Sequence, residues 1–351
     1  MSDTPIDRPK RRPRYSGKNP RQFHEKYKEL NPGRYAEDIA KILASGKTPA
    51  GTHRSIMVRE ILEVLAPKPG ETAVDATLGH GGHSVELLKA ILPDGRLIAV
   101  DADPIELPKT EARLRAMDFP TEALIIRRSN FAGLPNILAA ENVQGADVLL
   151  ADLGLSSMQI DDPARGFTFK RSGPLDLRFN PQRGQPASAF LAALEVPALA
   201  QILEANADEP RAASLARCIV DARKLNPIAT TTALADVIAN GLEAQPGQRS
   251  RDEVPDTIRR VFQALRIAVN DEFGALDLFL RNLPGCLKPG GRTAILTFHS
   301  GEDRRAKQSF KDGLRAGVYS RIAGEVIRPG PEELRANPRS APAKLRWAVR
   351  A

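Results

Sequence analysis

Eleven residues, Val74-Asp75-Ala76-Thr77-Leu78-Gly79-His80-Gly81-Gly82-His83-Ser84, predict a strand, a glycine turn and the first turn of a helix. The residues before the turn are apolar, and residues 85–92 after it have the spacing of an amphipathic helix. Glycine tolerates positive φ and allows another group to approach the backbone closely. The stretch is therefore typical of a cradle that holds a ligand against backbone N–H groups at a helix amino terminus.

Two classes of cofactor use such a cradle. A dinucleotide fingerprint, G-x-G-x-x-G, requires a third glycine where this chain has Ser84, which disfavours a nicotinamide cofactor. Asp75, at the end of the first strand, is typical of S-adenosylmethionine (SAM) enzymes, in which a carboxylate faces the methionine ammonium group. Asp101 ends the next strand and is placed to accept both ribose hydroxyls. Both classes use an acid like Asp101, so that residue alone does not decide, but the two acids together favour SAM.

Composition excludes several classes of protein. None of the apolar runs in the 351 residues reaches the roughly 18 that a membrane span requires, and the N-terminus is basic and proline-rich. We therefore expect a cytoplasmic protein with no membrane partner. Cys218 and Cys286 lie in helix-like apolar patterns, which predicts buried thiols rather than a disulfide framework. His80 and His83 lack Cys or carboxylate neighbours of zinc-site spacing, so no metal is expected.

The charge is concentrated at the two ends of the chain. Residues 1–34 hold ten Lys/Arg and four Asp/Glu, a net +6, and residues 292–351 hold thirteen and six, a net +7, which leaves −5 for the part between. Aromatic residues lie among the first cations, a combination that suits RNA phosphates and unstacked bases. Basic ends on an acidic body favour a polyanionic partner. A solvated, solubilising tail remains the alternative for either end.

Strand and helix patterns alternate from residue 53 onward, which predicts a parallel sheet with helices on both faces. We expect strands over 72–78, 96–101, 123–128, 146–152 and 292–298, and helices over 83–92, 109–117 and 131–140. Ligands of open α/β sheets bind at the carboxyl ends of the strands. Four loops at that edge carry candidate residues: Asp75, Asp101, Asn130-Phe131 and Asp152.

A long insertion separates the fourth strand from the last. Residues 154–185 are rich in Gly, Pro, Asp and Arg, whereas 197–207, 211–225 and 231–242 have helical spacing. We therefore expect an α/β, Rossmann-like SAM-dependent methyltransferase sheet with an inserted helical domain. The predicted organisation is a basic arm and linker over 1–52, a SAM-binding domain over 53–153 and 256–351, and an inserted loop and helical substrate-recognition domain over 154–255.

Several long stretches resemble the RsmH/MraW family, SAM-dependent enzymes that methylate the N4 of a cytosine in 16S (small-subunit) ribosomal RNA. The stretches are 152–162, 165–169, 173–178, 262–270, 298–304, and 337–340 with 344–346. The likeness runs from about His53 to the C-terminus. It implies ribosomal RNA or the small ribosomal subunit as the partner.

The resemblance also implies the cofactor contacts, residue by residue. They fall on Gly81, Gly82, His83, Asp101, Phe131, Asp152 and Gln159. Phe131 would flank the adenine, and Asp152 is in addition the candidate catalytic residue. Amino-methylating enzymes commonly keep an acid or amide at the end of the fourth strand, where it hydrogen-bonds the target amine. Second candidates are Ser156-Ser157, Asp161-Asp162 and His299, each of which could equally cap a helix or form a turn. Methyl transfer from SAM needs no metal.

The chain departs from the family pattern in three places. Gly301 stands where the family usually has Leu, residues 256–260 replace a His-Pro-Ala-Thr-Arg lead-in, and the arm before His53 exceeds the usual start. These departures leave two alternatives open: a diverged paralogue acting on another RNA site, and an rRNA-binding assembly factor with little activity. A DNA amino-methyltransferase is disfavoured, because residues 152–155 lack the expected Asn/Asp/Ser-Pro-Pro-aromatic motif.

Overall fold

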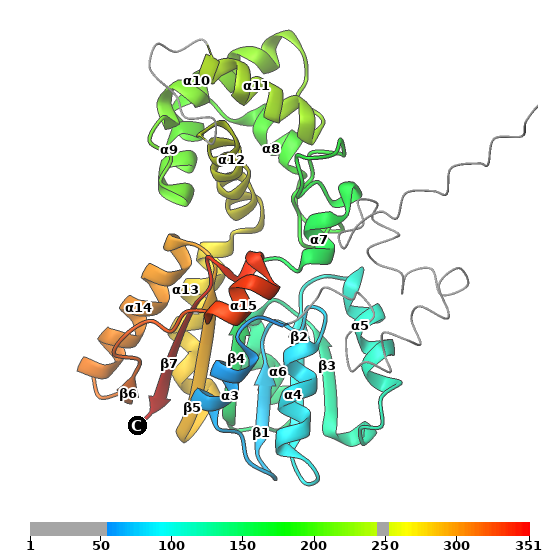
Figure 1. The fold of residues 1–351 in the computed structure, drawn as a ribbon, viewed down its shortest axis with the longest axis vertical. Coiled ribbons are helices and arrows are strands. Elements are labelled where there is room, and N and C mark those ends of the chain that lie inside the picture. The colour runs from blue at the N-terminus through cyan, green and yellow to red at the C-terminus, as the bar shows by residue number, and fades with distance from the viewer. Residues whose placement is uncertain (1–54, 244–252) are drawn as a thin grey trace, which may run out of the picture. The chain divides into compact units, whose positions relative to one another are not determined.

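A seven-stranded sheet organises the computed structural model, which describes residues 55–243 and 253–351 (Figure 1). The strand order is β3-β2-β1-β4-β5-β7-β6. The strands are β1 (Thr72–Asp75), β2 (Arg96–Asp101), β3 (Leu124–Arg128), β4 (Ala146–Asp152), β5 (Leu287–Thr297), β6 (Tyr319–Ile322) and β7 (Lys344–Arg350). All are parallel except β7, which pairs antiparallel with both β5 and β6. The α/β, Rossmann-like prediction is confirmed.

Alternate side chains of the central strands feed two separate apolar layers, as the period of two in a strand requires. The layer containing Ala73 is covered by α3 (Val58–Leu65), α4 (Gly82–Ile91) and α5 (Glu106–Arg115). The layer containing Val74 is covered by α6 (Leu134–Ala140), α13 (Glu272–Asn282) and α14 (Ser300–Arg315). Chain order reverses between β1 and β4, so the expected ligand crevice lies at the carboxyl ends of these strands.

The segment between β4 and β5 builds a third apolar cluster of its own. After the short helix α7 (Ser157–Asp161), the helices that supply this cluster are α8 (Ala187–Ala193), α9 (Val196–Ala207), α10 (Ala212–Leu225), α11 (Thr231–Glu243) and α12 (Glu253–Asn270). Phe167, Leu175 and Leu177 from the loop join this cluster, so the loop packs with the helices that follow it. The predicted domain boundaries at 153 and 256 stay predictions.

Several elements differ from the sequence-based expectation. Helix α5 begins at Glu106 and includes Pro108, because a proline in the first turn lacks only an N–H that would have no helical partner anyway. Residues 288–291, which precede the strand predicted over 292–298, form an irregularity within β5, since Ala146 pairs with Leu287 while Val148 pairs with Arg292. Strands β6 and β7 and the short α15 (Pro331–Ala336) were not predicted.

The predicted arm and linker over 1–52 lie outside the described residues, as do residues 244–252 of the predicted insertion. Within the described ranges, no helix combines the length and apolar character needed to cross a bilayer.

Candidate active site

Asp101 lies at the end of β2 and binds two loops at once. Its Oδ2 accepts from the backbone N–H of Gly79 at 2.7 Å, and its Oδ1 accepts from that of Asp103 at 2.8 Å. Burial raises the pKa of Asp101 to about 6, although these two backbone hydrogen bonds act in the opposite direction. Each carboxylate oxygen can accept a second hydrogen bond, so Asp101 can still bind a pair of hydroxyls.

The glycine turn after β1 is held tightly against α5. Gly81 has φ +74°, and an added Cβ would lie 3.1 Å from Leu114 Cδ1 and 3.2 Å from Thr110 Cγ2. The Thr110 hydroxyl also donates to the carbonyl oxygen of Gly79 at 2.7 Å. Helix α4 begins directly afterwards at Gly82, so its free N–H groups face the carboxyl edge of the sheet. The sequence-predicted cradle is therefore present in this geometry.

Asp75 is turned inward and supports that turn. It is 1% exposed, its Oδ2 accepts from the Ser84 hydroxyl at 2.7 Å, and its Oδ1 accepts from the N–H of Thr77 at 3.1 Å. Burial raises the pKa of this carboxyl group. Ser84 thus occupies the third-glycine position of a dinucleotide fingerprint because it bonds Asp75. The sequence led us to expect that Asp75 faces a methionine ammonium group. In the structure its carboxylate instead holds the turn.

His83, in the first turn of α4, lies beside Asp152, the last residue of β4. Nε2 of His83 is 3.4 Å from Oδ2 of Asp152, and it has no hydrogen bond of good geometry among the described residues. Burial lowers the pKa of His83, but the Asp152 carboxylate outweighs this effect, and the pKa lies above its usual value. Asp152 is about a quarter exposed, and its backbone N–H donates to the Thr77 hydroxyl at 2.6 Å. The pair can therefore exchange or hold a proton at the open edge of the sheet.

Phe131 and Gln159 border the same edge from the segments that follow β3 and β4. Phe131 begins a short 3-10 turn after β3 and packs edge-on against Phe279, with ring centroids 5.3 Å apart. Phe131 is only half-buried, so part of its side chain remains accessible at this edge. Gln159 in α7 is already engaged, because its Nε2 donates to Asp103 Oδ2 at 2.6 Å and its Oε1 accepts from the Ser156 N–H at 2.9 Å.

Most of the second candidates have structural roles. Ser156 caps α7 in a capping box with Gln159, and Asp162 caps the turn over 163–165 through the Ala164 N–H. Asp161 forms a two-point ion pair with Arg339, and its Oδ1 lies 2.9 Å from Arg339 Nη2. His299 caps α14 by accepting from the Glu302 N–H. These contacts favour the capping and turn interpretations over catalysis.

Sequence reasoning missed Asp103 and Arg165. Asp103 is 1% exposed and Arg165 6%, and Arg165 Nη1 donates to Asp103 Oδ2 at 2.7 Å. The two residues are 62 positions apart, so no local pattern reveals the pair. An acid two residues after Asp101 was visible in the sequence, but only the fold supplies its partner.

A cluster of Glu272, His299 and Glu302 has donor atoms within 4.8 Å of one another, as a metal site would. However, both oxygens of Glu272 accept from Arg266, at 2.7 and 2.9 Å. Glu302 Oε2 accepts from the Phe298 N–H at 2.8 Å, and its Oε1 lies 3.1 Å from His299 Nε2. Arg266 already binds both oxygens of Glu272, so the cluster is a network of ion pairs and hydrogen bonds at the end of β5.

The Gly301 departure has a packing explanation. A Cβ at Gly301 would lie 2.5 Å from Cζ of Phe273, whose buried ring therefore fills the space beside the first turn of α14. The guanidinium of Arg305 lies over the same ring, 3.6 Å from its centroid. Phe273 thus occupies the volume into which a side chain at 301 would project, and the two positions are coupled.

Replacing Gly301 with Leu should therefore destabilise the protein by about 1–3 kcal/mol, the usual cost of overpacking a filled core. Thermal unfolding monitored by circular dichroism should show a lower Tm. The matched control is Gly285→Leu, because an added Cβ at Gly285 meets nothing within 4 Å. A double variant with Phe273→Ala should recover part of the loss. If Gly301→Leu and Gly285→Leu unfold at the same temperature, the proposed coupling is wrong.

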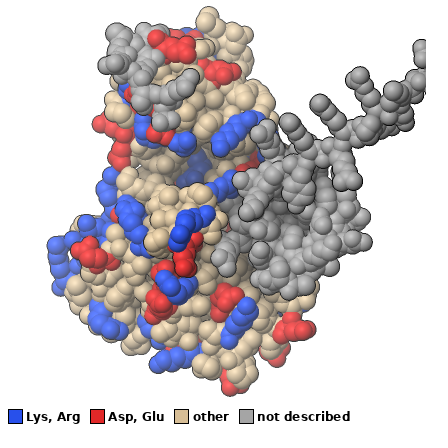
Figure 2. Space-filling view, viewed as in Figure 1, with Lys and Arg blue, Asp and Glu red and all other residues tan. Residues whose placement is uncertain are grey.

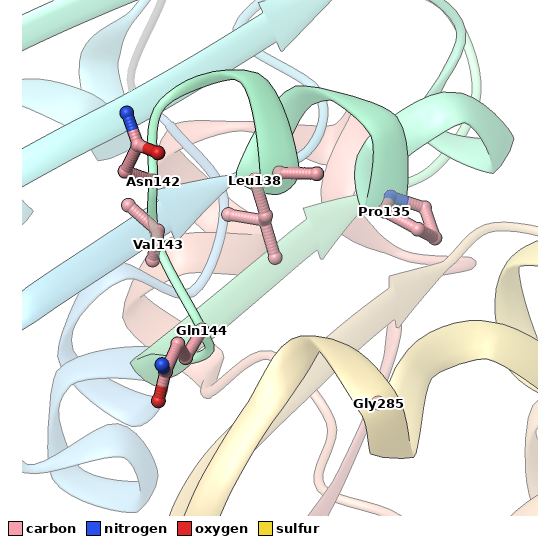
Figure 3. Close-up of a pocket in the computed structure, with 7 residues that line it drawn as sticks. Pro135, Leu138, Asn142, Val143, Gln144 and Gly285 are labelled. Carbon is pink, nitrogen blue, oxygen red and sulfur yellow. The ribbon is translucent and has the colours of Figure 1, made fainter.

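A cavity of about 430 Å³ lies away from this edge (Figure 3). It is lined by Pro135, Leu138, Ala139, Asn142, Val143, Gln144 and Gly285. Val143 and Gln144 precede β4 and Gly285 precedes β5, which places the cavity at the amino ends of these strands. Because Asp101 and Asp152 lie at the opposite ends, this cavity is not the candidate site.

The sequence of this chain is similar to the sequences of known proteins. A family model described as the MraW methylase family matches residues 50–351. The chain is 49% identical over 350 residues to "Ribosomal RNA small subunit methyltransferase H 2" of Alkaliphilus metalliredigens, with 99% of this chain and 100% of that protein covered. It is 50% identical over 343 residues to "Ribosomal RNA small subunit methyltransferase H 1" of Agathobacter rectalis, covering 97% and 98%. Both alignments therefore extend through most of the N-terminal arm.

A third relative is less similar. "Ribosomal RNA small subunit methyltransferase H" of Thioalkalivibrio sulfidiphilus is 40% identical over 322 residues, which cover 87% of this chain and 99% of that protein. The family match spans the whole described sheet and insertion, and the three relatives are 40–50% identical to this chain over the aligned residues. The chain therefore belongs to the MraW methylase family and has the fold of an S-adenosylmethionine-dependent methyltransferase.

Proposed function

We propose that this chain transfers a methyl group from SAM to the N4 of a cytosine in 16S ribosomal RNA. The observation that carries the proposal is the meeting of Asp101, His83 and Asp152 at the carboxyl edge of a methyltransferase sheet, in a chain whose relatives are named for methylating small-subunit rRNA. The partner is rRNA or the small ribosomal subunit.

The described residues fit SAM. Asp101 would hold the ribose hydroxyls with its remaining lone pairs, Phe131 would flank the adenine, and Gly81 and Gly82 would present bare backbone to the methionine part. The cofactor supplies an electrophilic methyl group on a sulfonium centre. Gln159 belongs to this set through the family resemblance, although its amide is bonded to Asp103 and Ser156 here.

Asp152 acts on the target amine. A cytosine amino nitrogen is a poor nucleophile because its lone pair is delocalised into the ring, so the enzyme must orient it and accept its proton. Asp152 lies at the end of β4 with a partly exposed carboxylate that can accept a hydrogen bond from this amine. His83 Nε2, 3.4 Å from Asp152 Oδ2, is placed to hold this carboxylate in position.

The C-terminal part of the chain offers cations to an RNA partner. Exposed Lys and Arg residues lie on α14 and near α15: Arg304, Lys307, Lys311, Arg315, Arg335 and Arg339. Figure 2 shows Lys and Arg side chains over these elements on the face in view, with acidic groups among them. This arrangement fits the +7 charge of residues 292–351 and supports a polyanionic partner.

Mass mapping of 16S rRNA tests the proposed function. A strain that lacks the gene should lose one N4-methyl group on a single cytosine, and the wild-type gene should restore it. Purified protein should add the methyl group to rRNA, as naked RNA or in the subunit. A methylation change at a different RNA site would favour the diverged paralogue, and unchanged RNA with normal SAM binding would favour the assembly factor.

The affinity for SAM should fall as the pH drops below about 6. Because the pKa of Asp101 is about 6, its carboxyl group is ionised above that pH and protonated below it. Only the ionised form can accept from both ribose hydroxyls with charge-assisted strength. Binding then releases one proton, and Kd should rise about tenfold per pH unit below pH 6. Calorimetric titrations at pH 5, 6 and 7 measure this change.

Asp101→Asn is the control for that titration, because it removes the ionisable group and keeps the shape of the side chain. The variant should bind SAM weakly at every pH, with a flatter profile. A wild-type Kd that stays constant between pH 5 and 7 would count against the ribose-binding role of Asp101.

A further inference from the structure

Asp103 joins four parts of the chain through one buried carboxylate. Its Oδ1 accepts from the N–H groups of Ile105 and Glu106, at 2.8 and 3.2 Å, at the start of α5. Its Oδ2 accepts from Gln159 at 2.6 Å and from Arg165 at 2.7 Å. Both oxygens are therefore fully used, and the acid fixes α7 and the turn after it to the loop that follows β2.

The same carboxylate stands next to the proposed ribose acid. The N–H of Asp103 donates to Asp101 Oδ1 at 2.8 Å, so the backbone of one residue and the side chain of the other are joined directly. Any shift of Asp103 would change the position of Asp101. The loop between β2 and α5 is thus held from two sides, by Asp101 itself and by residues of the insertion.

Arg165 extends the connection into the inserted segment. Its Nη2 donates to the carbonyl oxygens of Phe179 at 2.9 Å and Arg178 at 3.3 Å. The N–H of Phe179 in turn donates to Asn270 Oδ1 at 2.7 Å, at the end of α12. A continuous chain of hydrogen bonds therefore runs from Asp101 through Asp103 and Arg165 to the loop over 175–180.

We propose that Asp103 and Arg165 are positioning residues that couple the loop between β2 and α5, which holds the cofactor, to the loop over 175–180 in the substrate-recognition insertion. This inference rests on the proposed function. Neither residue touches the reacting atoms. Asp103 sets the places of Asp101 and Gln159, and Arg165 sets the place of residues 175–180. A buried ion pair is a weak source of stability, because desolvation offsets most of its attraction. The fork of Arg and the two oxygens of Asp instead fix geometry.

Two conservative variants separate the two ends of this connection. Asp103→Asn keeps the size of the side chain and one acceptor oxygen but loses the charge that binds Arg165 and Gln159. It should raise the SAM Kd at least tenfold by calorimetry. Arg165→Lys keeps the charge but loses the bonds to the carbonyls of Phe179 and Arg178. It should raise KM for rRNA about tenfold and leave the SAM Kd within about twofold.

Asp303→Asn is the matched control. Asp303 is a buried acid that binds Arg346, at 2.6 and 3.3 Å, and Lys344, so its replacement causes a comparable loss of buried charge. It should leave the SAM Kd and the rRNA KM unchanged at a temperature where it is folded. If Asp103→Asn weakens SAM binding no more than Asp303→Asn does, the positioning role is refuted.

A loss of folding can be distinguished from a loss of SAM binding in these variants. If Asp103→Asn does not fold, the double variant Asp103→Asn with Arg165→Gln removes both buried charges and should restore folding, while SAM binding stays at least tenfold weaker. Wild-type SAM affinity in that double variant would overturn the proposal. Calorimetry needs no RNA, so a chain that binds SAM but methylates no rRNA would refute the proposed function and still test Asp103.

Discussion

An Asp152→Ala variant is expected to lose about 100-fold or more in methyl transfer, in line with the 10²–10⁴-fold contribution of a positioned proton acceptor. The carboxylate at the end of β4 lies 3.4 Å from His83 Nε2 and is partly exposed, so it can contact a bound amine. Single-turnover transfer to rRNA measures the chemical step directly. RNA affinity, measured by filter binding, should change far less than the transfer rate.

Asp147→Ala is the control on the same strand. Asp147 lies near the start of β4, where it bonds Lys288 at 2.6 Å and the Thr72 N–H at 2.8 Å, and this end of the strand is remote from the cofactor edge. Its replacement should leave single-turnover transfer within a few-fold of wild type. Equal proportional losses of RNA binding and transfer in Asp152→Ala would remove Asp152 from the catalytic role.

The carboxyl edge of the sheet could be predicted from sequence because its signals are local. An apolar strand followed by Asp and a glycine turn places Asp75, and the same reasoning places Asp101 and Asp152. The structure confirms the strands at these positions. What local patterns could not show is which way an acid faces. Asp75 points inward because Ser84, one turn into α4, donates to it.

The residues that sequence reasoning missed depend on partners far along the chain. Strand β7 contains Arg346, which is 8% exposed because it bonds Asp303, 43 positions away. A charged residue at a buried position breaks the apolar alternation by which a strand is identified, so β7 was not predicted. The Asp103 and Arg165 pair could not be predicted either, because its two residues are 62 positions apart in the chain. Gly301 was visible as a departure, but only the position of Phe273 explains it.

Removal of the arm before Thr52 is expected to flatten the salt dependence of rRNA binding. Residues 1–34 carry a net charge of +6, and aromatic residues Tyr15, Phe23, Tyr27 and Tyr35 lie among or next to the cations. Each phosphate contact with single-stranded RNA adds ~0.7 to the log–log slope, so six contacts would add about 4. Between 50 and 200 mM salt, a slope difference of that size corresponds to roughly 250-fold in affinity. Filter binding at several salt concentrations measures both slopes.

A full-length variant separates charge from length in this experiment. Six cations of the arm are replaced by Gln: Arg8, Lys10, Arg11, Arg12, Arg14 and Lys18. If the arm grips phosphates, this variant and the truncated chain should show similarly reduced slopes, and both should bind SAM like wild type. A solubilising tail instead predicts three equal slopes and full methylation of assembled subunits. Equal slopes would therefore exclude the RNA-binding arm and leave the exposed cations of α14 and α15 as the electrostatic contact to rRNA.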